Sequence, residues 1–202
     1  MTAGKCQFVS RAGLKLEHAV REFELDVNGM LFADFGVNVG GFTDCLLQRG
    51  AAKIYALDTG YGVVHWRLRQ DPRVVVMERT NALHALPPEP VDLIVIDLAW
   101  TRQRLALPAA RQWLRHGGVV LTLVKPHYEL EEHEKRELLV HGRLDPSEAN
   151  RICERVMSSM PKLGITPVRW TQSPLTGGKS SRHGTGNIEF VVQGAVDGDA
   201  PT

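Results

Sequence analysis

The 202-residue chain has few cysteines, and they show no pairing pattern. The three thiols, Cys6, Cys45 and Cys153, are odd in number and include no Cys-x-x-Cys pair. This argues against a disulfide framework and against a zinc knuckle. The longest apolar runs, residues 91–96 and 119–124, are far too short to cross a bilayer, and the start of the chain lacks the apolar segment of a signal peptide. We therefore predict a cytoplasmic protein that does not enter a membrane.

Charge and metal-ligand patterns are also sparse. The formal net charge is only +1, so any nucleic-acid partner must be held by a local basic patch rather than by the whole surface. The eight histidines include no His-x-x-x-His or comparable pair, and no metal site is predicted. With 43% hydrophobic residues and no repeats, the chain is expected to form a single domain over residues 1–194, followed by a disordered polar tail at 195–202.

The apolar pattern predicts strands that alternate with helices. Seven short apolar runs are expected to be strands, at residues 31–34, 53–58, 74–78, 91–97, 119–125, 165–171 and 188–193. Helical spacing is found at 10–23 (with Ser10 as N-cap), 103–116, 129–140 and 145–160 (with Asp145 as N-cap before Pro146). This order indicates an α/β fold with a doubly wound, mostly parallel sheet. Ligands of such sheets bind beyond the carboxyl ends of the strands.

Residues 31–47, LFADFGVNVGGFTDCLL, combine the end of a strand, a glycine-rich turn and the start of a helix. Such a turn lets the backbone approach a ligand closely, beside the amide groups of the helix start. A dinucleotide site would read Gly-x-Gly-x-x-Gly, but here three residues separate Gly36 from Gly40, and Asp34 precedes both. A carboxylate there would repel a pyrophosphate and would suit the amino end of S-adenosylmethionine. The turn therefore favours a methyl donor over a dinucleotide, and a purely structural glycine turn is the remaining alternative.

Ionisable groups stand at the ends of four predicted strands, namely Asp34, Asp58, Asp97 and Lys125. Groups in these positions are expected to converge on one crevice. Asp58 lies 22 residues after Gly36, close to the offset at which an acid reaches the ribose hydroxyls of a bound nucleoside, although it could also be a turn residue. Beyond the third strand, an Asn at position 81 can offer its amide to an adenine edge or simply form a turn.

Seven segments, in colinear order over residues 9–192, resemble the FtsJ/TlyA group of S-adenosylmethionine-dependent ribose 2′-O-methyltransferases. They are VSRAGLKLEHA, FADFGVNVGGFTDCLLQRGA, IYALDTGYG, MERTNA, LIVIDLAW, LVKPHYE and GTGNIEFVV. They are most similar to the TlyA branch, whose members are often labelled hemolysins. The resemblance implies a Rossmann-like class I methyltransferase fold with a seven-stranded sheet, S-adenosyl-L-methionine as cofactor, and RNA, either rRNA or a ribosomal subunit, as partner.

The resemblance also implies a catalytic Lys-Asp-Lys-Glu tetrad, which matches Lys15, Asp97, Lys125 and Glu189. Methyl transfer to a ribose hydroxyl needs the oxygen, methyl and sulfur aligned and a proton removed from a weak nucleophile. Lys125 is the candidate proton acceptor, because a second cation at Lys15 and desolvation would favour its neutral form. The two carboxylates oppose this. An alternative is therefore that Lys125 stays charged and stabilises the developing alkoxide while water takes the proton.

The expected donor-binding residues are Asp34, Gly36, Asn38, Gly40, Gly41, Phe42, Asp58, Asn81 and Asp97. The turn of the family usually reads Asp-x-Gly-Ala-Ser-Thr-Gly-Gly-Phe, whereas this chain has Asn38 and Val39 in place of the two hydroxyls. We expect weaker donor binding, because valine offers no hydrogen bond. After Asp97, the usual Ser-Phe is Ala99-Trp100, which keeps an aromatic face that can stack on a base.

The residues expected to contact RNA are Arg11, Trp100, Lys179 and Arg182. Lys179 and Arg182 belong to a loop that is longer and more basic than the usual Gly-Pro-Lys-Gly-Asn and suits phosphate contacts. TlyA proteins carry an S4-type domain before the methyltransferase, whereas this sequence starts at the first catalytic-domain helix, so we expect RNA targeting to come from these residues or from a partner protein. A non-catalytic module that binds the donor or RNA is the main rival. The glycine spacing disfavours an NAD-dependent oxidoreductase, and a membrane-lytic protein would need a strongly amphipathic cationic segment.

Overall fold

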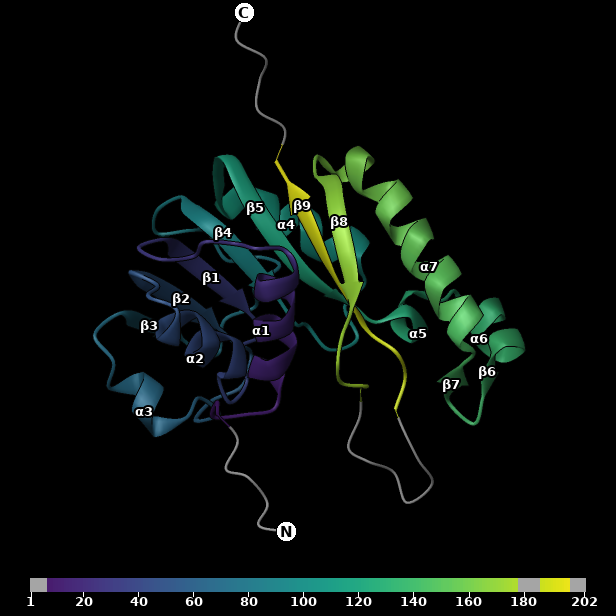
Figure 1. Cartoon of the computed structure of the whole chain (residues 1–202), viewed down its shortest axis with the longest axis horizontal. Helices are drawn as coiled ribbons and strands as arrows, with labels where there is room; N and C mark the ends of the chain where they lie inside the picture. The colour runs from purple at the N-terminus through teal and green to yellow at the C-terminus, as the bar shows by residue number, and fades with distance from the viewer. Residues whose placement is uncertain (1–6, 178–185, 197–202) are drawn as a thin grey trace, which may run out of the picture.

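The computed structural model describes residues 7–177 and 186–196, and every structural statement below refers to this part of the chain. One seven-stranded sheet has the order β3-β2-β1-β4-β5-β9-β8 (Figure 1). The strands are β1 (Leu31–Phe35), β2 (Lys53–Leu57), β3 (Val74–Met77), β4 (Val91–Ile96), β5 (Leu114–Val124), β8 (Thr166–Gln172) and β9 (Phe190–Ala195). The first five strands run parallel to one another, and β9 runs antiparallel to both β5 and β8. The predicted doubly wound, mostly parallel fold is confirmed.

Helices cover both faces of the sheet and bury two apolar layers (Figure 1). Successive strand residues point to opposite faces, so neighbours in one strand belong to different layers. Leu93 packs in the layer under α1 (Ala12–Glu22) and α2 (Gly41–Gln48), whereas Ile94 packs in the layer under α4 (Gln103–Trp113) and α7 (Pro146–Ser159). Two short helical turns are α3 (Trp66–Arg69) and the 3₁₀ turn η1 (Met160–Leu163).

The segment after β5 differs most from the predicted elements. The expected helix at 129–140 is divided into α5 (Pro126–Glu129), α6 (Glu132–Leu138) and a hairpin of β6 (Leu139–Val140) and β7 (Arg143–Leu144). A capping box between Glu131 and Glu134 forms the N-terminus of α6 and makes it a separate helix. The hairpin turns through His141 and Gly142, both with positive φ (51° and 77°), as a two-residue hairpin turn requires.

Several predicted boundaries move by a few residues. The first helix begins at Ala12, and its N-cap is Arg11 rather than Ser10, without a side-chain cap. The predicted helix 103–116 ends at Trp113, because the chain is already extended at the next residue. The cap of α7 is as predicted, with the Asp145 carboxylate accepting from the Ser147 backbone N–H at 2.8 Å.

Two observations concern the ends of the described chain and the membrane prediction. Strand β9 continues to Ala195, one residue into the expected tail, and residues 197–202 of that tail lie outside the described residues. Within the described ranges, no helix is both long and apolar enough to cross a bilayer.

Candidate active site

Two adjoining cavities open at the carboxyl ends of the parallel strands. The larger has a volume of about 830 Å³ and the smaller about 460 Å³. They share Gly36, Asn38, Asp97, Ala99 and Trp100 in their walls. Because these residues follow β1 and β4, the central pair of strands, the two cavities form one site with its junction at the middle of the sheet.

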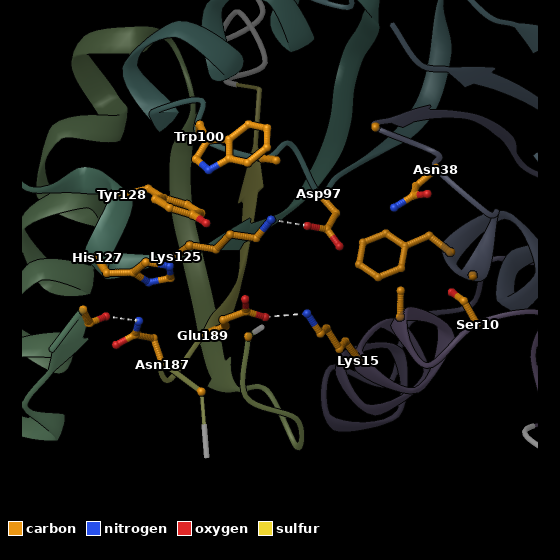
Figure 2. Close-up of a pocket in the computed structure, with 18 of the residues that line it drawn as sticks. Ser10, Lys15, Asn38, Asp97, Trp100, Lys125, His127, Tyr128, Asn187 and Glu189 are labelled. Carbon is orange, nitrogen blue, oxygen red and sulfur yellow. Dashed lines mark hydrogen bonds and ion pairs between the residues drawn. The ribbon is translucent and has the colours of Figure 1, made fainter. Parts of the chain in front are cut away.

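The four tetrad residues come together in the larger cavity (Figure 2). Lys125, at the end of β5, places its Nζ 2.5 Å from Oδ1 of Asp97, which follows β4. Lys15, on α1, places its Nζ 2.5 Å from Oε2 of Glu189, just before β9. Each of the four side chains is less than 20% exposed. The chain thus brings two ion pairs into one largely desolvated space, which matches the predicted juxtaposition.

Burial and neighbouring charge act in opposite directions on Glu189. Desolvation raises the pKa of this carboxyl, the Lys15 ammonium lowers it, and the net effect is a raised pKa. The side chain is 3% exposed, and a Cβ at Gly177 would lie 2.2 Å from its Oε1. The absence of a side chain at Gly177 therefore leaves the room that Glu189 occupies.

The glycine turn lets three segments approach closely. Gly36 has φ +90°, and a Cβ there would lie 2.7 Å from the backbone oxygen of Asp97. Gly40 has φ +104° and is the N-cap of α2, while a Cβ at Gly41 would lie 2.3 Å from Oγ of Ser10. The turn is therefore packed against the β4 end on one side and the α1 start on the other. Gly36 and Gly41 line the larger cavity, as does Phe42, whereas Gly40 lines neither cavity.

Asp34 does not face the cavities, contrary to the predicted contact with the donor. Strand β1 continues to Phe35, and the Asp34 side chain points under the start of α2, where it is 1% exposed. Its Oδ2 accepts from the backbone N–H and the hydroxyl of Thr43, at 3.1 and 2.7 Å. Its Oδ1 is buried with no hydrogen-bond partner among the described residues. Asp34 thus holds the start of α2, which directly follows the glycine turn, from the interior of the protein.

The buried carboxyl predicts a pH-dependent stability. Desolvation raises the pKa of Asp34 to about 7 from an ordinary value of 3.8, and the nearby Asp97 and Asp58 charges add to the shift. The folded chain therefore holds this proton more tightly than the unfolded chain. The associated stability is fully present below about pH 4 and is lost as the pH rises to about 7.

Asp34→Asn keeps an acceptor oxygen for Thr43 and removes the titration. We expect its unfolding free energy, measured by urea denaturation between pH 4.5 and 8, to fall less with pH than that of the wild type. At pH 8 the variant should be more stable by about 2–4 kcal/mol, from roughly three pKa units. A variant whose stability falls as steeply as the wild type would contradict this account.

Residues expected to hold the donor nucleoside line the smaller cavity. The Asp58 carboxylate accepts from the backbone N–H groups of Asn38 and Gly60, both at 2.8 Å, so its position is fixed. Asn38 itself has φ +49° and an exposed side chain. Asn81 also lines this cavity, while its Oδ1 accepts from the Leu83 N–H at 3.0 Å. Asn81 therefore both stabilises a turn and lines the cavity, so the two alternatives predicted for it are compatible.

The residues expected to contact RNA are only partly placed by the structure. Trp100 is 80% exposed, has φ +56° and lines both cavities. Arg11 is exposed but lines neither cavity. Lys179 and Arg182 lie outside the described residues.

One wall of the larger cavity was not predicted from the sequence. His127 and Tyr128 on α5 have ring centroids 4.1 Å apart, and Asn187 and the β6–β7 hairpin lie beside them. Burial and the neighbouring Lys125 charge lower the pKa of His127 to about 4, so its imidazole is neutral at pH 7. Its Nδ1 is buried and has no hydrogen-bond partner in the described chain. The segment LVKPHYE carried the signal, since His127 and Tyr128 directly follow the strand-end Lys125.

Comparison with known proteins agrees with this geometry. The model of the FtsJ-like methyltransferase family matches residues 8–183. The chain belongs to this family. It is 40% identical over 191 residues to "Putative rRNA methyltransferase YqxC" of Bacillus subtilis, covering 92% of this chain and 65% of that protein.

Other relatives carry related names. The chain is 38% identical over 197 residues to the 16S/23S rRNA (cytidine-2'-O)-methyltransferase TlyA of Mycobacterium tuberculosis, covering 95% of this chain and 70% of that protein. A solved structure described as a "putative hemolysin" from Lactococcus lactis superposes with a TM-score of 0.85 at 38% identity, covering 96% of this chain and 91% of that one. The chain thus spans about two thirds of the length of the curated relatives named here.

Proposed function

We propose that this FtsJ-like methyltransferase transfers a methyl group from S-adenosylmethionine to a ribose 2′-hydroxyl of RNA, with ribosomal RNA as the substrate. The observation that carries the proposal is the presence of two ion pairs, Lys125–Asp97 and Lys15–Glu189, in the larger cavity. Asp97 also lines the smaller cavity and so stands at the junction of the two. The names of its relatives support the substrate class, since two of them refer to rRNA methylation and one of these to the 2′ oxygen.

The smaller cavity suits the nucleoside part of the donor. The fixed Asp58 carboxylate is an acceptor for ribose hydroxyls, and the Asn81 side chain lies in the same wall. At the junction, the bare Cα of Gly36 leaves space that a Cβ would fill against the Asp97 backbone. The donor supplies an electrophilic methyl carbon. These residues fit a donor whose methyl end reaches past Gly36 into the larger cavity.

Lys125 has two of its hydrogen-bonding directions occupied. Its Nζ lies 2.5 Å from Asp97 Oδ1 and donates to the backbone oxygen of Leu98 at 3.2 Å. An ammonium group would then have one N–H left to stabilise the ribose oxygen as its proton leaves, whereas a neutral amine would have its lone pair left to take that proton. In both cases Asp97 and Leu98 orient the lysine toward the substrate oxygen.

Lys15 and Glu189 complete the pocket. The Glu189 carboxylate fixes the Lys15 ammonium, which leaves further N–H donors free to hold the ribose. With Lys125 protonated, the tetrad carries two positive and two negative charges, so the developing alkoxide meets a neutral but strongly dipolar and desolvated environment. Preorganised groups of this kind stabilise a transition state without reorienting solvent.

The test combines donor binding with product analysis. Purified protein is expected to bind S-adenosylmethionine in calorimetry and to transfer a labelled methyl group to rRNA, either protein-free or in intact ribosomal subunits. Digestion to nucleosides and mass spectrometry should then give a 2′-O-methylated nucleoside. A methyl group on a base would contradict the proposal. Donor binding with no label on any of these RNAs would favour the non-catalytic module instead.

A further inference from the structure

The larger cavity has a side that the methyl-transfer chemistry leaves unassigned. Figure 2 shows Ser10 and Asn38 on one side of the two ion pairs, and Tyr128, His127 and Asn187 on the other. We call this second side the hairpin wall. It consists of the cavity-lining residues of α5, α6, the β6–β7 hairpin and the segment before Glu189, namely His127, Tyr128, Lys135, Leu139, His141, Gly142, Arg143 and Asn187.

The hairpin wall adds basic side chains to the lining of the larger cavity and no acidic ones. Among the described residues, the acids that line the larger cavity are Asp97 and Glu189, and each is paired with a tetrad lysine. The further cations in the lining are Lys135 and Arg143, with His141 beside them at the hairpin turn. Lys135 also contacts Glu132, 2.6 Å from its Nζ, but Glu132 does not line the cavity. An anionic part of a ligand would therefore be drawn to the hairpin wall.

Asn187 fixes the hairpin against the catalytic segment. Its Nδ2 donates to the backbone oxygen of Gly142 at 2.9 Å, and its Oδ1 accepts from the Leu144 N–H at 2.8 Å. Its own backbone oxygen accepts from the Gly177 N–H at 2.8 Å. Asn187 stands two residues before Glu189, so its side chain ties the hairpin to the segment that carries this tetrad residue (Figure 2).

We infer that the hairpin wall is the binding subsite for the phosphate on the 3′ side of the target ribose, with Arg143 as a contact and Asn187 as a positioning residue. The inference rests on the proposed function and adds the part of the RNA that this side of the cavity holds. In RNA the 3′ phosphate is attached to the carbon next to the one that bears the 2′-hydroxyl. A hydroxyl that reaches Lys125 therefore brings this phosphate to a wall next to Lys125. The hairpin wall begins at His127, two residues after Lys125, and contains the basic side chains of Lys135 and Arg143. Phosphate contacts of this kind fix register rather than read sequence.

The first test removes the charge of Arg143. Arg143→Gln is expected to raise KM for protein-free rRNA about three- to tenfold with kcat within twofold, and to reduce the salt slope of log kcat/KM by about one. Donor affinity should not change. Arg136→Gln is the matched control, because this arginine is on α6, is exposed and does not line the cavity. Equal KM and equal salt slope for Arg143→Gln and the wild type would overturn the subsite while leaving methyl transfer established.

The second test releases the hairpin. Asn187→Ala removes both side-chain hydrogen bonds and is expected to raise KM for rRNA and lower kcat, each by about five- to tenfold, at unchanged donor affinity. Asn187→Asp keeps the acceptor for Leu144 and loses the donor to Gly142, so its effect should be intermediate. Asn150→Ala is the control, since Asn150 Nδ2 donates to the Pro146 oxygen at 2.9 Å within α7, away from the cavity.

The two tests also separate this inference from the proposed function. RNA affinity by fluorescence anisotropy is measured alongside transfer, with a labelled rRNA fragment as probe. Weaker RNA binding by Arg143→Gln, in a protein that transfers no methyl group, would support the subsite and contradict the enzyme assignment. A lower melting temperature of Asn187→Ala with kinetic constants equal to the wild type would instead show that Asn187 acts on stability alone and would overturn its positioning role.

Discussion

Lys125→Ala is expected to lower the rate of methyl transfer by about 10³-fold, the range expected for loss of a catalytic proton acceptor or oxyanion stabiliser. The lysine Nζ is the group in the tetrad that has both a carboxylate and a backbone oxygen holding it in place. Donor affinity should stay within about threefold, because Lys125 does not line the smaller cavity. Single-turnover assays with labelled donor, together with calorimetry for donor binding, measure the two quantities.

Lys125→Arg distinguishes the two roles of this residue. A guanidinium stays charged and cannot accept the proton. If Lys125 works as a cation, the arginine variant should retain clearly more activity than Lys125→Ala. If it works as a base, the two variants should be equally inactive. Lys162→Ala, an exposed lysine on η1, is the control and should behave as the wild type. Transfer by Lys125→Ala at a rate near that of the wild type would exclude both roles.

Gly36→Ala is expected to lower donor affinity at least 100-fold and to reduce the unfolding free energy by about 2–4 kcal/mol. The added Cβ would lie 2.7 Å from the Asp97 backbone oxygen, in a residue with φ +90°. The ends of β1 and β4 must then separate at the junction of the two cavities, which displaces Asp97 from Lys125. Calorimetry with S-adenosylmethionine and urea denaturation are the measurements.

The control for this prediction is Gly29→Ala. Gly29 also has a positive φ, +71°, but a Cβ there would meet nothing within 4 Å. The Gly29→Ala variant should therefore lose only the free energy of the backbone strain, about 1 kcal/mol of unfolding free energy. Its donor affinity should equal that of the wild type. If both variants lost the same stability and neither lost donor affinity, the close approach of Gly36 to Asp97 would have no part in the site.

The sequence predicted the position of a site residue correctly where an ionisable residue directly follows the last residue of a strand. Asp58, Asp97 and Lys125 follow β2, β4 and β5 directly, and parallel strands place such residues at one edge of the sheet. Asp34 shows the limit of the same pattern. Its run continues through Phe35, so the acid is part of the strand and points into the protein. A carboxylate buried behind a turn and one facing a ligand have the same sequence spacing.

The hairpin wall was not predicted, for a local reason. Leucines at 138 and 139 and Val140 continue the apolar spacing of the preceding helix, and the turn residues His141-Gly142 are not a strong hairpin signal such as Asn-Gly. The hairpin depends instead on Asn187, which is 45 residues from Gly142 in the chain. A contact at that separation cannot be recognised from the spacing of one segment.

The antiparallel direction of β9 places the last tetrad residue of the sequence at the catalytic edge of the sheet. Because β9 runs opposite to β5, it is the start of β9 that meets the carboxyl end of β5, and Glu189 stands there. Its partner Lys15 is 174 residues away, on the first helix. While the chain is being synthesised, Lys125 and Asp97 can come together long before Glu189 and Asn187 have left the ribosome. A partly made chain therefore lacks Glu189, one of the four tetrad residues, and the Asn187 contacts that fasten the hairpin. We expect the proposed methyl transfer only after β9 has been added.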